Sequence, residues 1–163
     1  MRATVEASAP PPRRGSPWLL ACWLALWLVV PCAHGLERGT SSAGVAFMSG
    51  GASEEEQARM RAERPGYSFW LTTAARGSGA YLAGVRVRIT DESGQRVLEH
   101  TMDGPWLYAA LPLGRYEVEA ALFDEQLGRL EIQRGSTAIH PGDRHSMVLY
   151  FIPGDMAGEA RTR

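Results

Sequence analysis

The feature that most restricts the fold of this chain is an alternation of apolar and polar residues with a period of two, which begins at Tyr67. In residues 85–90 and again in residues 115–120, every second side chain is apolar and those between are charged or polar. Successive side chains of a β-strand point to opposite faces, so this alternation is typical of strands with one buried face. The sequence therefore predicts a domain built from strands.

Short turns separate seven segments with this strand character. One hairpin turn is indicated at residues 91–94, Asp-Glu-Ser-Gly, where the glycine can adopt a positive φ. Because no helical pattern interrupts the segments, the sequence predicts an all-β fold, a sandwich or a barrel. The seven expected strands are residues 67–72, 85–90, 96–102, 106–111, 115–120, 129–133 and 146–152.

One short helix is expected before the strands, at residues 53–64. Ser53 and Glu56 have the spacing of a capping box, and Pro65 with Gly66 ends the segment. Its apolar stripe is thin, and a helix of about 12 residues is marginal alone, so we expect it to lean on the β domain. We interpret its charged faces as a solvated surface.

The segments on either side of this ordered part are expected to be flexible. Residues 36–52 are rich in glycine and serine and indicate a lead-in, although residues 45–47 have the pattern of a short edge strand. Residues 153–163 are expected to form a disordered tail.

Residues 1–35 have the pattern of a signal peptide. A basic region precedes the apolar run at residues 18–30, WLLACWLALWLVV, whose thirteen residues span roughly 20 Å as a helix, short of a hydrocarbon core of roughly 30 Å. Small residues at Ala33 and Gly35 predict cleavage after Gly35 and a periplasmic or extracellular location. One alternative is that residues 18–33 stay uncleaved and anchor the chain to the inner membrane. A second, suggested by the prolines at residues 10–12, is a start codon further along.

Composition excludes several kinds of site. Both cysteines, Cys22 and Cys32, lie in the leader, so the part from Leu36 onward has no disulfide and no cysteine-based metal or nucleophilic site. Without the three arginines and one glutamate of the leader, 14 basic and 17 acidic residues remain, a formal charge of −3. This balance argues against nucleic acid and against an anionic membrane surface as partners.

Two stretches carry a resemblance to a known family: LAGVRVRITDESGQRV at residues 82–97 and DGPWLYAALPLGRYEVEA at residues 103–120. Together they resemble the carboxypeptidase regulatory-like domain, a transthyretin-like β-sandwich of exported bacterial proteins, over about residues 67–151. The resemblance implies a seven-stranded Greek-key sandwich. The second stretch matches the motif of this family at Leu111, Pro112, Gly114, Tyr116, Val118 and Ala120.

The family implies a stability or interaction module rather than an enzyme, and fold alone assigns no chemistry. The enzymes among transthyretin-like folds, the 5-hydroxyisourate hydrolases, end in Tyr-Arg-Gly-Ser, whereas this chain ends in Ala-Arg-Thr-Arg and lacks their first histidine motif. A remote alternative is a hydrolase or metal site that uses His140, Asp143 and His145, which lie in one Pro-Gly loop. No nucleophile elbow or phosphate-binding loop is present, so we predict no catalytic site, no metal and no cofactor.

Aromatic residues offer the better functional candidates. In the family pattern Trp106 and Tyr108 fall on inward positions, so we expect them in the core. Trp70 shares its face with Ser68 and Thr72 and is the candidate ligand contact. Packing of Trp70 under the helix at residues 53–64 is an equal alternative. We therefore expect a non-enzymatic module with a binding or structural role in the bacterial envelope, its partner an envelope protein or a glycan. The main alternative is a carbohydrate- or peptide-binding module.

Overall fold

Nine strands, one α-helix and one 3₁₀ turn make up residues 35–125 and 128–152, the part of the chain that the computed structural model describes. In chain order these elements are β1 (Glu37–Thr40), β2 (Ala46–Gly50), α1 (Glu54–Glu63), η2 (Arg64–Gly66), β3 (Phe69–Ala75), β4 (Val85–Asp91), β5 (Arg96–Met102), β6 (Trp106–Ala109), β7 (Gly114–Asp124), β8 (Arg129–Ile139) and β9 (His145–Phe151).

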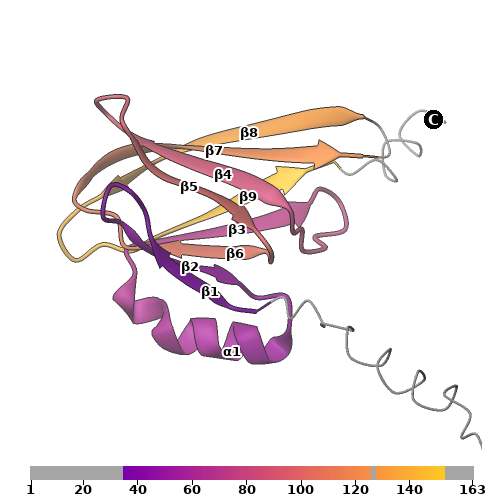
Figure 1. Ribbon diagram of the computed structural model, residues 1–163, viewed down its shortest axis with the longest axis horizontal. Helices are drawn as coiled ribbons and strands as arrows, with labels where there is room; N and C mark the ends of the chain where they lie inside the picture. Colours follow the sequence, from indigo (N-terminus) through magenta and orange to yellow (C-terminus); the bar gives the residue numbers. More distant parts are fainter. Residues whose placement is uncertain (1–34, 126–127, 153–163) are drawn as a thin grey trace, which may run out of the picture. The chain divides into compact units, whose positions relative to one another are not determined.

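The strands form two sheets. Sheet A has the order β1-β2-β6-β3-β9, and sheet B has the order β5-β4-β7-β8. Every pairing between neighbouring strands is antiparallel except that of β3 with β9, which is parallel. Figure 1 shows the two sheets one above the other, with α1 along the side of sheet A that faces away from sheet B. The described residues therefore form three layers, α1, sheet A and sheet B.

The inner faces of the two sheets enclose the main hydrophobic core. Because alternate residues of each strand face inward, the core takes every second side chain of the predicted apolar pattern. Burial of one such side chain stabilises the fold by about 1.5–3 kcal/mol. Its fully buried members include Phe69, Leu71, Leu107 and Phe151 from sheet A and Val85, Val87, Ile89 and Val118 from sheet B.

A second, smaller core lies on the outer face of sheet A, beneath α1. Met60 of the helix is fully buried there and packs with Met48 of β2 and with Trp106 and Tyr108 of β6. A helix of ten residues is marginal alone, so α1 depends on this contact. The expectation that the helix leans on the β domain is confirmed.

Of the two hydrogen bonds that define a capping box, only the one accepted by Ser53 is present. Ser53 Oγ accepts a hydrogen bond from the backbone N–H of Glu56 at 3.2 Å. The Glu56 carboxylate, however, accepts from the N–H groups of Gly51 and Ala52, both at 3.0 Å. Glu56 thus joins the helix to the end of β2.

All seven predicted strands are present, as β3 to β9. The prediction of a flexible lead-in at residues 36–52 is wrong, because this segment contains β1 and β2. The described residues therefore contain nine strands rather than seven. Val45 and Phe47 are buried in the main core, and β2 lies between β1 and β6 rather than at an edge. The glycines allow close packing here, because a Cβ at Gly39 would lie only 2.7 Å from the ring of Phe47.

Within residues 35–125 and 128–152, no helix is long and apolar enough to cross a membrane. The predicted signal peptide or anchor at residues 1–35, apart from Gly35, lies outside the described residues. The same is true of the predicted tail at residues 153–163.

Candidate functional site

A hollow of about 220 Å³ lies on the outer face of sheet A, beside α1. Strand register places its floor: Trp70 of β3 stands opposite Tyr108 of β6, and Thr72 opposite Trp106, so these side chains share one face. Tyr81, held by an isolated bridge to Ala74, contacts Trp106 edge-on with ring centroids 6.2 Å apart. We call this hollow the aromatic pocket; its lining includes Arg61, Arg64, Trp70, Tyr81, Trp106 and Tyr108.

Two arginines from the end of α1 and the 3₁₀ turn close one side of the aromatic pocket. Arg61 and Arg64 are three residues apart, a spacing that places them on the same helix face. The Arg64 guanidinium carbon lies 3.6 Å from the centroid of the Trp70 ring, and that of Arg61 lies 5.1 Å from the Trp106 ring. A cation over an aromatic face is stabilised by about 0.5–2 kcal/mol, so both guanidinium groups are held in place.

Neither of these arginines forms an ion pair with a carboxylate of the described residues. Arg61 donates a hydrogen bond to Gln57 Oε1 at 3.0 Å. The nearby acids of α1 bind other arginines: Glu63 pairs with Arg38, and Glu55 pairs with Arg59. The charges of Arg61 and Arg64 are therefore available to a ligand. Both side chains are exposed, as expected of a solvated helix surface, and each also contacts a tryptophan ring.

The polar groups of the pocket floor are partly desolvated. Burial raises the pKa of Tyr108, and the charges of Arg64 and Arg61 act against that rise. The indole Nε1–H of Trp70 is buried and has no hydrogen-bond acceptor within the described residues. A buried donor without an acceptor costs about 1–3 kcal/mol.

The structure places Trp70, the predicted ligand contact, in the aromatic pocket. Trp106 and Tyr108 are buried, at 8% and 5% exposure, as expected of core residues. The expectation that they point inward is wrong, because Leu107 and Ala109 take the inner face of β6 and the two aromatics lie under α1. The signal for this was that β6 is apolar at every position, which indicates a strand covered on both faces.

The loop histidines lie elsewhere. His140 and His145 both line a hollow of about 620 Å³ at the end of sheet B, whereas Asp143 is not part of its lining. Asp143 instead donates its backbone N–H to the carbonyl of His140 at 3.0 Å. Within the described residues, no three His, Cys, Asp or Glu side chains are grouped so as to hold a metal ion.

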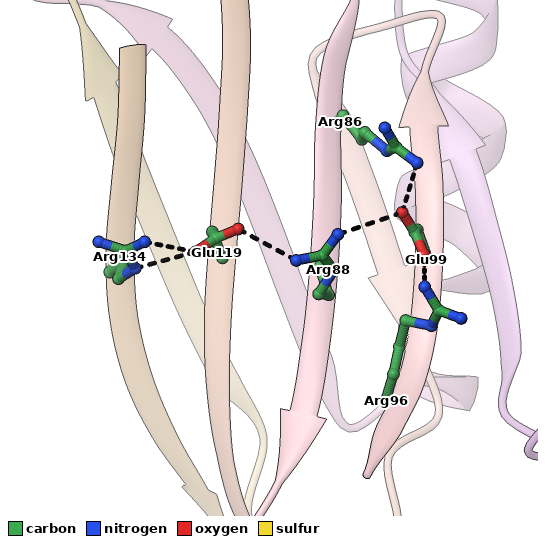
Figure 2. Close-up of polar contacts among 6 residues, drawn as sticks. All are labelled: Arg86, Arg88, Arg96, Glu99, Glu119 and Arg134. Atoms are coloured by element: carbon green, nitrogen blue, oxygen red, sulfur yellow. Dashed lines mark hydrogen bonds and ion pairs between the residues drawn. The ribbon is translucent and has the colours of Figure 1, made fainter. Parts of the chain in front are cut away.

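A network of charged residues covers the outer face of sheet B (Figure 2). Glu99 of β5 pairs with Arg96, with Arg86 at 2.6 Å and with Arg88 at 3.6 Å. Glu119 of β7 pairs with Arg88 at 3.5 Å and with Arg134 at 2.7 Å. Arg88 thus lies between the two glutamates, and Arg86 pairs with Glu99 of β5.

Burial tends to raise the pKa of Glu99, but the charges of Arg96, Arg86 and Arg88 outweigh it and hold that pKa below its ordinary value. Glu99 thus stays ionised among its arginines. This network satisfies its carboxylates internally.

Comparisons with known proteins returned no match: no family model matches the chain, and neither does any curated protein or solved structure. These comparisons therefore do not identify the chain as a carboxypeptidase regulatory-like domain.

Proposed function

We propose that this chain is an exported, non-enzymatic β-sandwich module of the bacterial cell envelope that binds an anionic ligand in the aromatic pocket. The observation that carries the proposal is the pair of guanidinium groups stacked on Trp70 and Trp106 without a carboxylate partner in the described residues. Arginine stacked on an aromatic ring still presents its N–H groups at the ring edge, and these match carboxylate or phosphate oxygens.

Export is part of this proposal and rests on the leader at residues 1–35. The transthyretin-like, Greek-key topology of a carboxypeptidase regulatory-like domain is part of it too. Burial of Tyr116, Val118 and Ala120 supports that topology, because the family pattern uses those positions as core. The function of such a domain follows from its site and not from its fold.

The pocket favours a charged ligand over a neutral sugar. Sugar-binding aromatics present a free ring face for stacking, whereas Arg64 covers Trp70 and Trp106 is buried. Carbohydrates therefore fit this pocket best when they carry a carboxylate.

The test is a titration of the protein, purified after expression of the full chain in a bacterial host, with small probes. The indole N–H resonance of Trp70, assigned by its loss in Trp70→Phe, reports binding independently of the leader tryptophans. Trigalacturonate, tetraglutamate and inorganic phosphate are the anionic probes, and maltotriose is the neutral one. We expect at least one anionic probe to shift the resonance and maltotriose to leave it unchanged.

Variants of the same helix supply the control. The double variant Arg61→Gln with Arg64→Gln is expected to weaken binding at least tenfold, because each charged hydrogen bond contributes about 1.5–3 kcal/mol. Arg59→Gln removes an arginine that pairs with Glu55 outside the pocket and is expected to change nothing. No shift with any anionic probe, or equal binding by the double variant, overturns the proposal.

A further inference from the structure

Strand β9 forms one end of sheet A, and its second edge has no strand partner among the described residues. His145 donates its N–H to Ser68 and Phe151 accepts from the N–H of Arg76, so the odd-numbered residues of β9 face β3. Backbone groups of successive strand residues point to opposite sides. The N–H and C=O groups of Ser146, Val148 and Tyr150 therefore point away from β3, along an open edge.

Between Ser146 and Tyr150 this edge lacks the protection that other edges of the two sheets have. At Ile152, just beyond β9, the N–H donates to Glu131 of β8 at 2.9 Å and the carbonyl accepts from Arg129 at 3.5 Å. Natural edge strands are blunted by charged residues, proline, bulges or short length. The edge strand β1 is short and carries Glu37 and Arg38, and β5 and β8, the edges of sheet B, each carry arginine and glutamate. In β9, residues 146–151 contain no charged residue and no proline. An open edge of this kind is a template for another strand.

The open edge and the aromatic pocket adjoin each other. Ser146 and Val148 line the pocket, and their partners in the β3 register are Trp70 and Thr72. A strand added to β9 would lie two strand spacings, about 10 Å, from Trp70. A long acidic side chain on that strand would point toward Arg64, which extends from the helix side over Trp70.

The surface beside the pocket carries exposed apolar side chains at Tyr81 and along β9. Tyr81 is 55% exposed, and Val148 and Tyr150 are each 46% exposed. Val148 and Tyr150 stand two residues apart on the outer face of β9, so an added strand would pack its own side chains at every second position against them. This surface requires apolar side chains and a carboxylate on the same face of the ligand.

We propose that the ligand of the aromatic pocket is an extended acidic peptide segment of a partner protein, which pairs with the open edge of β9 and directs a carboxylate toward Arg64, the arginine that lies over Trp70. The inference rests on the proposed function and specifies its ligand. A peptide is favoured over an acidic glycan because a strand supplies N–H and C=O groups at the spacing of the β9 edge. A glycan has no such repeat.

The experiment measures binding of a labelled peptide, Ser-Val-Thr-Glu-Thr-Tyr-Ser, to the protein made from the full chain, by fluorescence anisotropy. In an extended strand its valine, glutamate and tyrosine lie on one face. In one further peptide glutamine replaces the glutamate. In two others the backbone nitrogens are methylated at alternate positions, along one edge or along the other. We expect the glutamine form, and one methylated form but not the other, to bind at least tenfold more weakly.

Protein variants test the edge from the other side. Tyr150→Pro removes an N–H on the open edge, at a position that does not line the aromatic pocket, while leaving the ladder to β3 intact, and proline is tolerated on edge strands. We expect it to weaken peptide binding at least tenfold and to leave trigalacturonate binding unchanged, whereas Tyr150→Phe binds both normally. Circular dichroism checks that the proline variant folds, and the methylated peptides keep the test decisive if it does not.

The outcomes separate this inference from the proposed function. If anionic probes shift Trp70 but neither methylated form loses affinity, or trigalacturonate binds more tightly than the peptide, the peptide inference is wrong and the pocket still binds anions. If no anionic probe shifts Trp70, both proposals fail. If the peptide does not bind and Tyr150→Pro converts a dimer to a monomer, the edge pairs with a second copy and the peptide inference is overturned.

Discussion

The outer faces of the two sheets both present arginine, but they use it in different ways. On sheet B, Arg86, Arg88 and Arg134 lie against Glu99 or Glu119, so positive charge is bound to carboxylates of the same domain (Figure 2). On the side of sheet A, Arg61 and Arg64 lie against tryptophan rings and against no carboxylate of the described residues. The difference teaches that the number of arginines does not mark a ligand surface. A ligand surface is marked instead by arginines that have no carboxylate partner within the fold.

The largest expected effect comes from removing the residue that holds α1 on sheet A. Met60→Ala empties a fully buried position, and truncations of this kind cost about 2–5 kcal/mol of unfolding free energy. Urea unfolding followed by circular dichroism measures the loss. The control Glu55→Ala, on the exposed side of α1, is expected to stay within about 0.5 kcal/mol. A loss below about 1 kcal/mol would contradict a dependence of the helix on this contact.

The next effect makes the sheet A face resemble the sheet B face. Thr72→Glu places a carboxylate in the lining of the aromatic pocket, close to both arginines. We expect it to pair with them and to weaken binding of the anionic probes at least tenfold, or about 1.4 kcal/mol. Thr72→Gln, which matches the glutamate in size without its charge, should bind almost normally. Equal binding by the glutamate variant would show that the arginines do not contact the ligand.

A smaller effect concerns the pH dependence of the sheet B network. The pKa of folded Glu99 lies below its ordinary value of 4.5, so the stability that its charge contributes is fully present above that value. This contribution is lost as the pH falls through the lowered pKa of the folded state. Glu99→Gln should therefore be less stable than the wild type at pH 7 and equally stable at low pH, in urea titrations at both values. A difference that persists at low pH would assign the effect to packing.

The smallest effect is expected from Arg134→Ala. Its side chain is exposed, and surface ion pairs contribute about 0–1 kcal/mol. Stability should change by at most that amount, and binding of the anionic probes should stay the same. A tenfold loss of binding would place the ligand on sheet B and reverse the comparison between the two faces.

Much of the fold follows from patterns of the sequence. Alternation with a period of two located β4 and β7 most clearly, and strand character between turns located the other five strands from β3 to β9. The Asp-Glu-Ser-Gly turn forms the β4–β5 hairpin, where the carboxylate of Asp91 accepts from the N–H of Ser93 at 2.9 Å. Ser53 marked the start of α1. These signals succeed because each depends on neighbours in the sequence.

The missing parts depend on contacts between distant segments. Glycines such as Gly39 give residues 36–52 a composition typical of flexible segments. Gly39 nevertheless packs against Phe47, where a larger residue would not fit. Trp70 was found as a candidate because it alternates with inward residues. Arg61 and Arg64 were not found as candidates. Their stacking on Trp106 and Trp70 joins a helix to strands, so it leaves no pattern among neighbouring residues of the sequence.

The parallel pairing of β3 with β9 has a consequence for the order in which the molecule becomes functional. Phe69 and His145, 76 positions apart, begin this ladder, and contacts of such long sequence separation form slowly. The aromatic pocket includes residues of β9, so its wall is incomplete until β9 has been synthesised and released. A nascent or truncated chain that ends before residue 145 can form the hairpins of sheet B but has no finished pocket. Such a chain is expected not to bind the proposed ligand, although most of its core residues are already present.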